Sequence, residues 1–178
     1  YNPETQQTAR KQTGSFYTPR EIVQYMVDES LVTHLKRTVG NELESEYRKL
    51  LDYADNEILL TEQQKLAIMQ SLYNCKILDP ACGSGAFPVG VLQQMVHILK
   101  QIDPDNSRWK NMLLQFAIDE TSEAYLNSTA EERREAVADI ERAFDENVNY
   151  PDYARKLHLI ENCIYGVDIQ PIAIQISK

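Results

Sequence analysis

The feature of the sequence that most constrains the fold is an apolar segment followed by a glycine-rich turn and an apolar helical pattern. Cys75–Asp79 is short and apolar, as a strand would be, and the turn occupies Pro80–Gly85. Apolar residues then recur at helical spacing until Asp103. Three of the six glycines of the chain lie within Gly83–Gly90. A strand, a glycine turn and a helix in this order open an α/β unit, so the predicted fold class is α/β.

The turn suits a close approach of backbone to a ligand. Gly83 and Gly85 stand at the start of the helix, where glycine leaves room that a side chain would fill. Free N–H groups and the helix dipole favour an anionic group there. The third glycine of the dinucleotide fingerprint is absent, because Phe87-Pro88 stands near its place, and this counts against a dehydrogenase. Asp79, at the strand end, instead suits a ligand with an ammonium group, although a plain turn is an open alternative.

A second acid follows a second apolar segment. Cys163–Ile169 is predicted to be a buried strand, with Asp168 near its end. A carboxylate at the tip of a second strand can accept hydrogen bonds from both hydroxyls of a ribose. It usually follows the glycines after about 20 residues. Here it comes much later, so residues of about 106–160 would be a helical insertion. The alternative is an acid that only ends a strand or caps the next helix.

Polar capping residues mark the helix starts. Residues 1–13 are polar and aperiodic, which predicts a flexible lead-in. The element Gly14–Pro19 is a turn into a helix predicted over Pro19–Arg37, with Thr18 as N-cap and Glu21 closing a capping box. Further predicted helix starts are Thr61 boxed with Gln64, Thr129 boxed with Glu132, and Pro171.

The net charge of −9 argues at first sight against a nucleic-acid partner, since phosphate-binding surfaces need clustered Lys and Arg. Most of the surplus, however, belongs to one segment. Asp119–Glu146 contains ten acids and three bases, whereas residues 1–40 contain four acids and five bases. A solvated helical face explains the acidic segment. The charge therefore does not exclude DNA.

Other classes of site are excluded by composition. Cys75, Cys82 and Cys163 are too few and too unevenly spaced for a disulfide scaffold or a zinc site. The three histidines are scattered without partners at ligand spacing, so no metal is expected. No apolar run is long enough for a membrane span, and we expect a cytoplasmic location without membrane association.

Three segments together resemble a known family. Asp79-Pro80-Ala81-Cys82-Gly83-Ser84-Gly85-Ala86-Phe87 is similar to the cofactor loop of adenine-specific DNA methyltransferases. Gly14–Pro19 resembles the element that precedes this loop, and Tyr165–Ile169 resembles the second cofactor motif. All three occur in the family's order. The resemblance is greatest to bacterial restriction–modification enzymes, especially fused type IIG restriction–methylation polypeptides, and to methyltransferases of phage-defence systems.

The resemblance implies a fold, a cofactor and site residues. The fold would be a partial Rossmann-like methyltransferase fold, mostly helical, with residues 14–178 as the N-terminal part of the domain. S-adenosylmethionine would be the cofactor. Asp79 would hold its ammonium group, Asp168 its ribose hydroxyls, and Ile169 would lie against the adenine. The methionine part would contact Tyr17, Thr18 and Pro19, and the loop around it would comprise Pro80, Ala81, Cys82, Gly83, Ser84 and Gly85.

One departure from the family concerns catalysis. The family's Asn/Asp-Pro-Pro-aromatic motif, which holds the flipped adenine, is absent, and Asn149-Tyr150-Pro151 lies upstream of Asp168 without the second proline. We therefore assign no catalytic residue. The chain, which stops at Lys178 within a predicted helix, is expected to be an inactive front portion of a parent that methylates adenine N6 in double-stranded DNA. The alternatives are a nucleotide- or NAD-binding α/β enzyme fragment and a helical interaction domain. The sequence does not indicate an oligomeric state.

Overall fold

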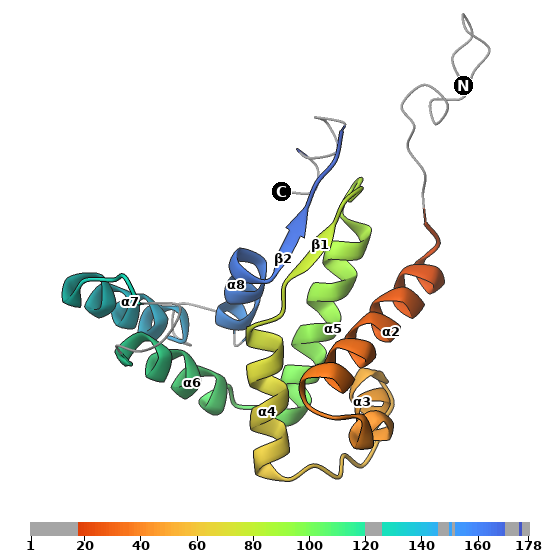
Figure 1. The fold of residues 1–178 in the computed structure, drawn as a ribbon, viewed down its shortest axis with the longest axis horizontal. Coiled ribbons are helices and arrows are strands. Elements are labelled where there is room, and N and C mark those ends of the chain that lie inside the picture. The colour runs from red at the N-terminus through yellow and green to blue at the C-terminus, as the bar shows by residue number, and fades with distance from the viewer. Residues whose placement is uncertain (1–17, 120–125, 146–149, 151, 170–174, 176–178) are drawn as a thin grey trace, which may run out of the picture.

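The computed structural model describes residues 18–119, 126–145, 150, 152–169 and 175. These residues form a mostly helical structure around one small parallel sheet (Figure 1), which confirms a mixed α/β composition dominated by helix. The elements in chain order are α2 (Arg20–Thr38), η1 (Asn41–Leu43), α3 (Glu44–Leu51), α4 (Glu62–Tyr73), β1 (Ile77–Asp79), α5 (Ala86–Ile102), α6 (Ser107–Ile118), α7 (Ala130–Ala143), α8 (Tyr153–Asn162) and β2 (Ile164–Gly166).

Two of the predicted capping boxes are confirmed and one is wrong. At the starts of α4 and α7, the side chains of Thr61 and Thr129 each accept a hydrogen bond from the main-chain N–H of the third helical residue. The side chain of that residue in turn accepts a hydrogen bond from the threonine main-chain N–H. At α2, in contrast, Pro19 is the N-cap with a ψ of 146°, and no side chain caps the helix. Because Pro19 is extended, the helix begins one residue later than predicted. Glu21 is then only the second helical residue and does not complete a box with Thr18.

The sheet pairs two strands that are far apart in the sequence. β1 and β2 are parallel, with Ile77 opposite Ile164 and Asp79 opposite Gly166. The helices α5, α6, α7 and α8 lie between them in the chain. The C-terminal ends of both strands and the N-terminal ends of α2 and α5 lie at the same end of the structure (Figure 1). This common end is where both predicted acids are placed.

Helix α5 lies at the centre of the packing, in contact with α2, α3, α4, α8 and β2. Its buried side chains include Met95, Ile98 and Leu99, none of which is exposed to solvent. Gly90 lets α2 come close, since a Cβ at this position would lie 3.2 Å from Val23 Cγ1. Helix α7, in contrast, buries no residue. The core thus holds α5 beneath the common end, whereas β1 and β2 are only partly buried, which corrects the prediction that the second strand is buried.

Some sequence predictions are not decided by this architecture. The lead-in of residues 1–13 and the helix start at Pro171 lie outside the described residues. Helices α6, α7 and α8 occupy the region of 106–160, but their status as an insertion stays a prediction. Within the described ranges, none of the helices combines the length and apolarity that crossing a membrane requires.

Candidate functional site

Asp79 ends β1 with its two carboxylate oxygens in different situations. Its Oδ1 accepts a hydrogen bond from the Ala81 N–H at 3.0 Å, which makes a tight turn into the loop. Its Oδ2 is buried and has no hydrogen-bond partner among the described residues. A buried acceptor without a donor costs free energy, so this oxygen is suited to a donor supplied by a ligand. A cationic donor such as an ammonium group would form the stronger kind of hydrogen bond.

The loop after Asp79 depends on two glycines in the left-handed region. Gly83 has a φ of +53° and Gly85 a φ of +88°. Residues with a Cβ adopt such angles at a cost, which explains glycine at both positions. The turn is closed by the Gly85 N–H, which donates to the Cys82 carbonyl at 2.8 Å. Gly85 is also the N-cap of α5 and provides no side chain to cap it, which favours a ligand at its first N–H groups.

The segment after β2 holds this loop in place. The Asp168 Oδ2 accepts a hydrogen bond from the Gly83 N–H at 2.9 Å, across 85 positions in the sequence. The Cys82 N–H donates to the Val167 carbonyl at 3.0 Å, and the Val167 N–H donates to the Asp79 carbonyl at 2.9 Å. The two acids that the sequence singles out are therefore connected through one loop. Their separation along the chain does not keep them apart in the fold.

Gly166 is a residue of this region that the sequence analysis did not single out. A Cβ on Gly166 would lie 3.0 Å from the Cys82 Sγ and 3.1 Å from the Cys82 Cβ. The Cys82 side chain is only 6% exposed and covers the glycine. A glycine inside a strand often marks such a close approach, and this signal was present in the sequence.

The other predicted site residues lie around the same end. Thr18 and Pro19 precede α2, whose N-terminal end points toward the same end of the structure as the strand ends in Figure 1. Within the described ranges, neither residue makes a hydrogen bond to the loop. Ile169 is 93% exposed, so its apolar surface is available for a ligand. Pro80, Ala81 and Ser84 are exposed loop residues. Tyr17 lies outside the described residues.

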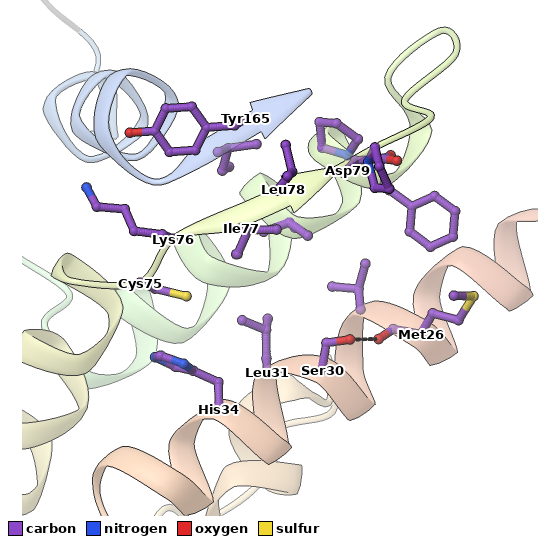
Figure 2. Close-up of a pocket in the computed structure, with 16 residues that line it drawn as sticks. Met26, Ser30, Leu31, His34, Cys75, Lys76, Ile77, Leu78, Asp79 and Tyr165 are labelled. Atoms are coloured by element: carbon purple, nitrogen blue, oxygen red, sulfur yellow. Dashed lines mark hydrogen bonds between the residues drawn. The ribbon is translucent and has the colours of Figure 1, made fainter. Parts of the chain in front are cut away.

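An apolar cavity of about 430 Å³ adjoins the site between α2 and β1. Figure 2 shows Met26, Leu31 and His34 of α2 on one side of it and β1 on the other. Asp79 lies at the loop end of this cavity (Figure 2). His34 Nε2 is engaged with the Ser71 carbonyl at 3.2 Å and with the Ser71 Oγ at 3.0 Å. Its imidazole is therefore part of the helix packing.

Two other kinds of reactive centre, a nucleophilic thiol at Cys75 or Cys163 and a metal site, are not supported by the described residues. Burial raises the pKa values of the Cys75 and Cys163 thiols to about 11, so both are protonated at neutral pH and poor nucleophiles. Within the same ranges, no three His, Cys, Asp or Glu side chains are grouped so that they could hold a metal ion. The candidate site therefore consists of two acids and a backbone loop.

Comparison with known proteins supports a restriction–modification relation. A protein of Methanocaldococcus jannaschii named "Putative type II restriction enzyme and methyltransferase RM.MjaORFECS2P" is 25% identical over 181 residues. The match covers 95% of this chain and 12% of that protein, so this chain corresponds to a small part of its length. No family model matches the chain, and no solved structure matches it. The similarity therefore concerns nearly the whole chain and a protein named for both restriction and methylation.

Proposed function

We propose that this chain is the S-adenosylmethionine-binding part of an adenine-specific DNA methyltransferase of a restriction–modification system. The observation that carries the proposal is the hydrogen bond from the Gly83 N–H to Asp168. It joins the glycine loop and the second acid into one site, as binding of a single adenosyl ligand requires. The similarity to a protein named as a restriction enzyme and methyltransferase supports the same class.

The groups at this end fit the cofactor. The unpartnered Oδ2 of Asp79 would accept a hydrogen bond from the ammonium group of its methionine part. The space next to Gly83 is open, because a Cβ there would meet no atom within 4 Å. Asp168 would accept hydrogen bonds from the ribose hydroxyls, and the exposed Ile169 would pack against the adenine. Thr18 and Pro19, with Tyr17 before them, would contact the methionine part.

The finer fold and the wider function belong to the same proposal. Two adjacent parallel strands followed by acids, with α5 after the first, support a Rossmann-like methyltransferase domain whose front portion is residues 14–178. Bound S-adenosylmethionine would supply the methyl group for adenine N6 in double-stranded DNA, in a cytoplasmic parent enzyme. This chain would hold the cofactor and leave the adenine to groups that it lacks. It would therefore be inactive alone.

Ligand titration tests the proposal. We expect S-adenosylmethionine and S-adenosylhomocysteine to raise the melting temperature of the chain and to give saturable binding in calorimetry, whereas NAD does neither. A response to NAD alone would support a nucleotide-binding α/β enzyme fragment instead. A folded chain that responds to none of the three ligands would contradict the proposed function and leave a helical interaction domain.

Two substitutions of Asp168 distinguish its hydrogen bond to the Gly83 N–H from its proposed contacts with the ribose. Asp168→Ala removes both the acceptor for the Gly83 N–H and the ribose ligand, so affinity for S-adenosylmethionine should fall by more than about tenfold. Asp168→Asn keeps an oxygen for the Gly83 N–H but loses one of two acceptors for the diol. Its affinity should lie between those of the wild type and Asp168→Ala. Unchanged calorimetric affinity in both variants would contradict the ribose role.

A further inference from the structure

The contact between Gly166 and Cys82 is the tightest point at which the loop meets β2. A Cβ on Gly166 would lie 3.0 Å from the Cys82 Sγ and 3.1 Å from its Cβ. Both distances are shorter than ordinary van der Waals contact. The Cβ of Cys82 is attached directly to the loop backbone and cannot swing away as the end of a long side chain could. A methyl group on Gly166 would therefore press on the loop itself.

The loop has little freedom to yield locally at this point. The Cys82 N–H is bonded to the Val167 carbonyl at 3.0 Å, and the Cys82 carbonyl accepts from the Gly85 N–H at 2.8 Å. The next residue, Gly83, donates to Asp168 at 2.9 Å. Moving Cys82 away from β2 would stretch the first and last of these bonds together. It would also change the position of the loop relative to both acids.

We propose that Gly166 is a positioning residue of the cofactor site, because the absence of a side chain there lets Cys82 seat the loop against β2 so that Asp79 and Asp168 have the spacing one ligand requires. This inference rests on the proposed function for the identity of that ligand. Gly166 acts through Cys82 and needs no contact with the cofactor. Its requirement for glycine is one of space, since its φ does not lie in the left-handed region.

A double-mutant cycle on the whole 178-residue chain tests the contact. Gly166→Ala should weaken S-adenosylmethionine binding by about tenfold in calorimetry, from the loss of roughly one hydrogen bond. The same substitution in a Cys82→Gly background should cost much less, because both the Sγ and the Cβ that oppose the methyl group are gone. Gly90→Ala is the matched control, since a Cβ at Gly90 would meet only the ends of two valine side chains of α2 and should leave affinity unchanged.

The outcomes decide whether Gly166 positions the loop through Cys82. An equal loss of affinity from Gly166→Ala in both backgrounds, or no loss in either, overturns the inference. If affinity falls in every variant only in proportion to its melting temperature, the loss reflects general destabilisation and the inference is also overturned. If Gly166→Ala does not fold alone but folds in the Cys82→Gly background, the coupling is seen in stability instead, which supports the inference.

A second measurement does not depend on the cofactor. Cys82, which packs against Gly166, is only 6% exposed, so its thiol should react slowly with iodoacetamide in the wild type. In Gly166→Ala the displaced loop should expose the thiol and raise that rate, as followed by peptide mass spectrometry. An unchanged rate would contradict the displacement. If the wild-type chain does not bind S-adenosylmethionine while Gly166→Ala still shows the faster alkylation, only the proposed function is contradicted.

Discussion

Asp79 and Asp103 lie beyond opposite ends of α5, and their carboxylates have opposite surroundings. Asp103 is 1% exposed, and its oxygens accept hydrogen bonds from the main-chain N–H groups of Arg108 at 3.2 Å and Trp109 at 3.0 Å. The buried guanidinium of Arg155 lies 3.3 Å from its Oδ2 and also donates to its main-chain carbonyl. Each oxygen of this acid thus has a donor within the chain.

Asp79 keeps one oxygen without a hydrogen-bond partner among the described residues, although that oxygen is shielded from water. The difference indicates what each acid does. A buried carboxylate whose donors come from the chain stabilises the fold, whereas one that lacks a donor is available to a ligand. The Asp103 end of α5 is therefore structural, and the Asp79 end is the candidate site. Substitutions at the two ends should separate stability from binding.

The largest effect is expected at the Asp103 end. Arg155→Met removes the guanidinium and leaves a buried carboxylate without its cation, which should lower the free energy of unfolding by about 3–5 kcal/mol. Urea denaturation measures this change. Arg134→Met, at an exposed position of α7, is the control and should change stability by less than about 0.5 kcal/mol. Equal stability in the two variants would break the structural interpretation of Asp103.

The next effect is a pH dependence near the same end. His158 stacks on Tyr73 with ring centroids 4.5 Å apart, and burial lowers its pKa from 6.5 to about 4. The unfolded chain binds a proton near pH 6.5 and the folded chain does not, so stability falls as the pH drops between those values. The loss between pH 7 and pH 5 should be about 2 kcal/mol. Urea denaturation at pH 7 and pH 5 measures this loss, and His158→Phe should remove it. The same pH dependence of stability in the variant would show that another group causes it.

A smaller effect, on binding alone, is expected at the Asp79 end. Asp79→Asn keeps an oxygen for the Ala81 N–H but removes the charge, so affinity for S-adenosylmethionine should fall by about tenfold with little change in melting temperature. Asp55→Asn, in an exposed segment between α3 and α4, is the control for loss of one negative charge. If Asp79→Asn reduced stability as Arg155→Met does, the two ends of α5 would not differ as described.

The smallest effect is expected between the two ends. Gly90→Ala gains helix propensity of about 0.5–1 kcal/mol, while the new methyl group would lie 3.2 Å from Val23 Cγ1. Because a valine side chain can shift by a few tenths of an ångström, the net change in unfolding free energy should stay within about 1 kcal/mol. Thermal unfolding measures it. If the free energy of unfolding fell by more than about 2 kcal/mol, the valine side chains of α2 could not shift to accommodate the methyl group.

Local signals in the sequence predicted two of the three capping boxes correctly. The boxes at Thr61 and Thr129 are found because capping is a matter of four consecutive residues. At Thr18-Pro19 the same pattern fails, because the extended proline shifts the helix by one residue. The fold is predictable where neighbours in the chain decide it.

The sequence singles out side chains of the candidate site but not its backbone contacts. Asp79 and Asp168 stand out because acids end two apolar segments. The bonds from Gly83 to Asp168 and from Cys82 to Val167 join groups that have no signature in sequence, since every residue but proline has an N–H. The ion pair of Asp103 with Arg155 was missed for a similar reason, because 52 positions separate its members. The strands β1 and β2 themselves are far apart in the sequence, with α5, α6, α7 and α8 between them.

That spacing sets an order for assembly. During synthesis, the loop and α5 leave the ribosome long before Val167 and Asp168 exist, so the bonds that hold Cys82 and Gly83 are absent from the nascent chain. Closing a segment of this length costs chain entropy that only the finished contacts repay. The early segments can pack as helices, but the two acids cannot be brought together before β2 docks. Any competence to bind a ligand between them would therefore arise only once β2 has formed and docked.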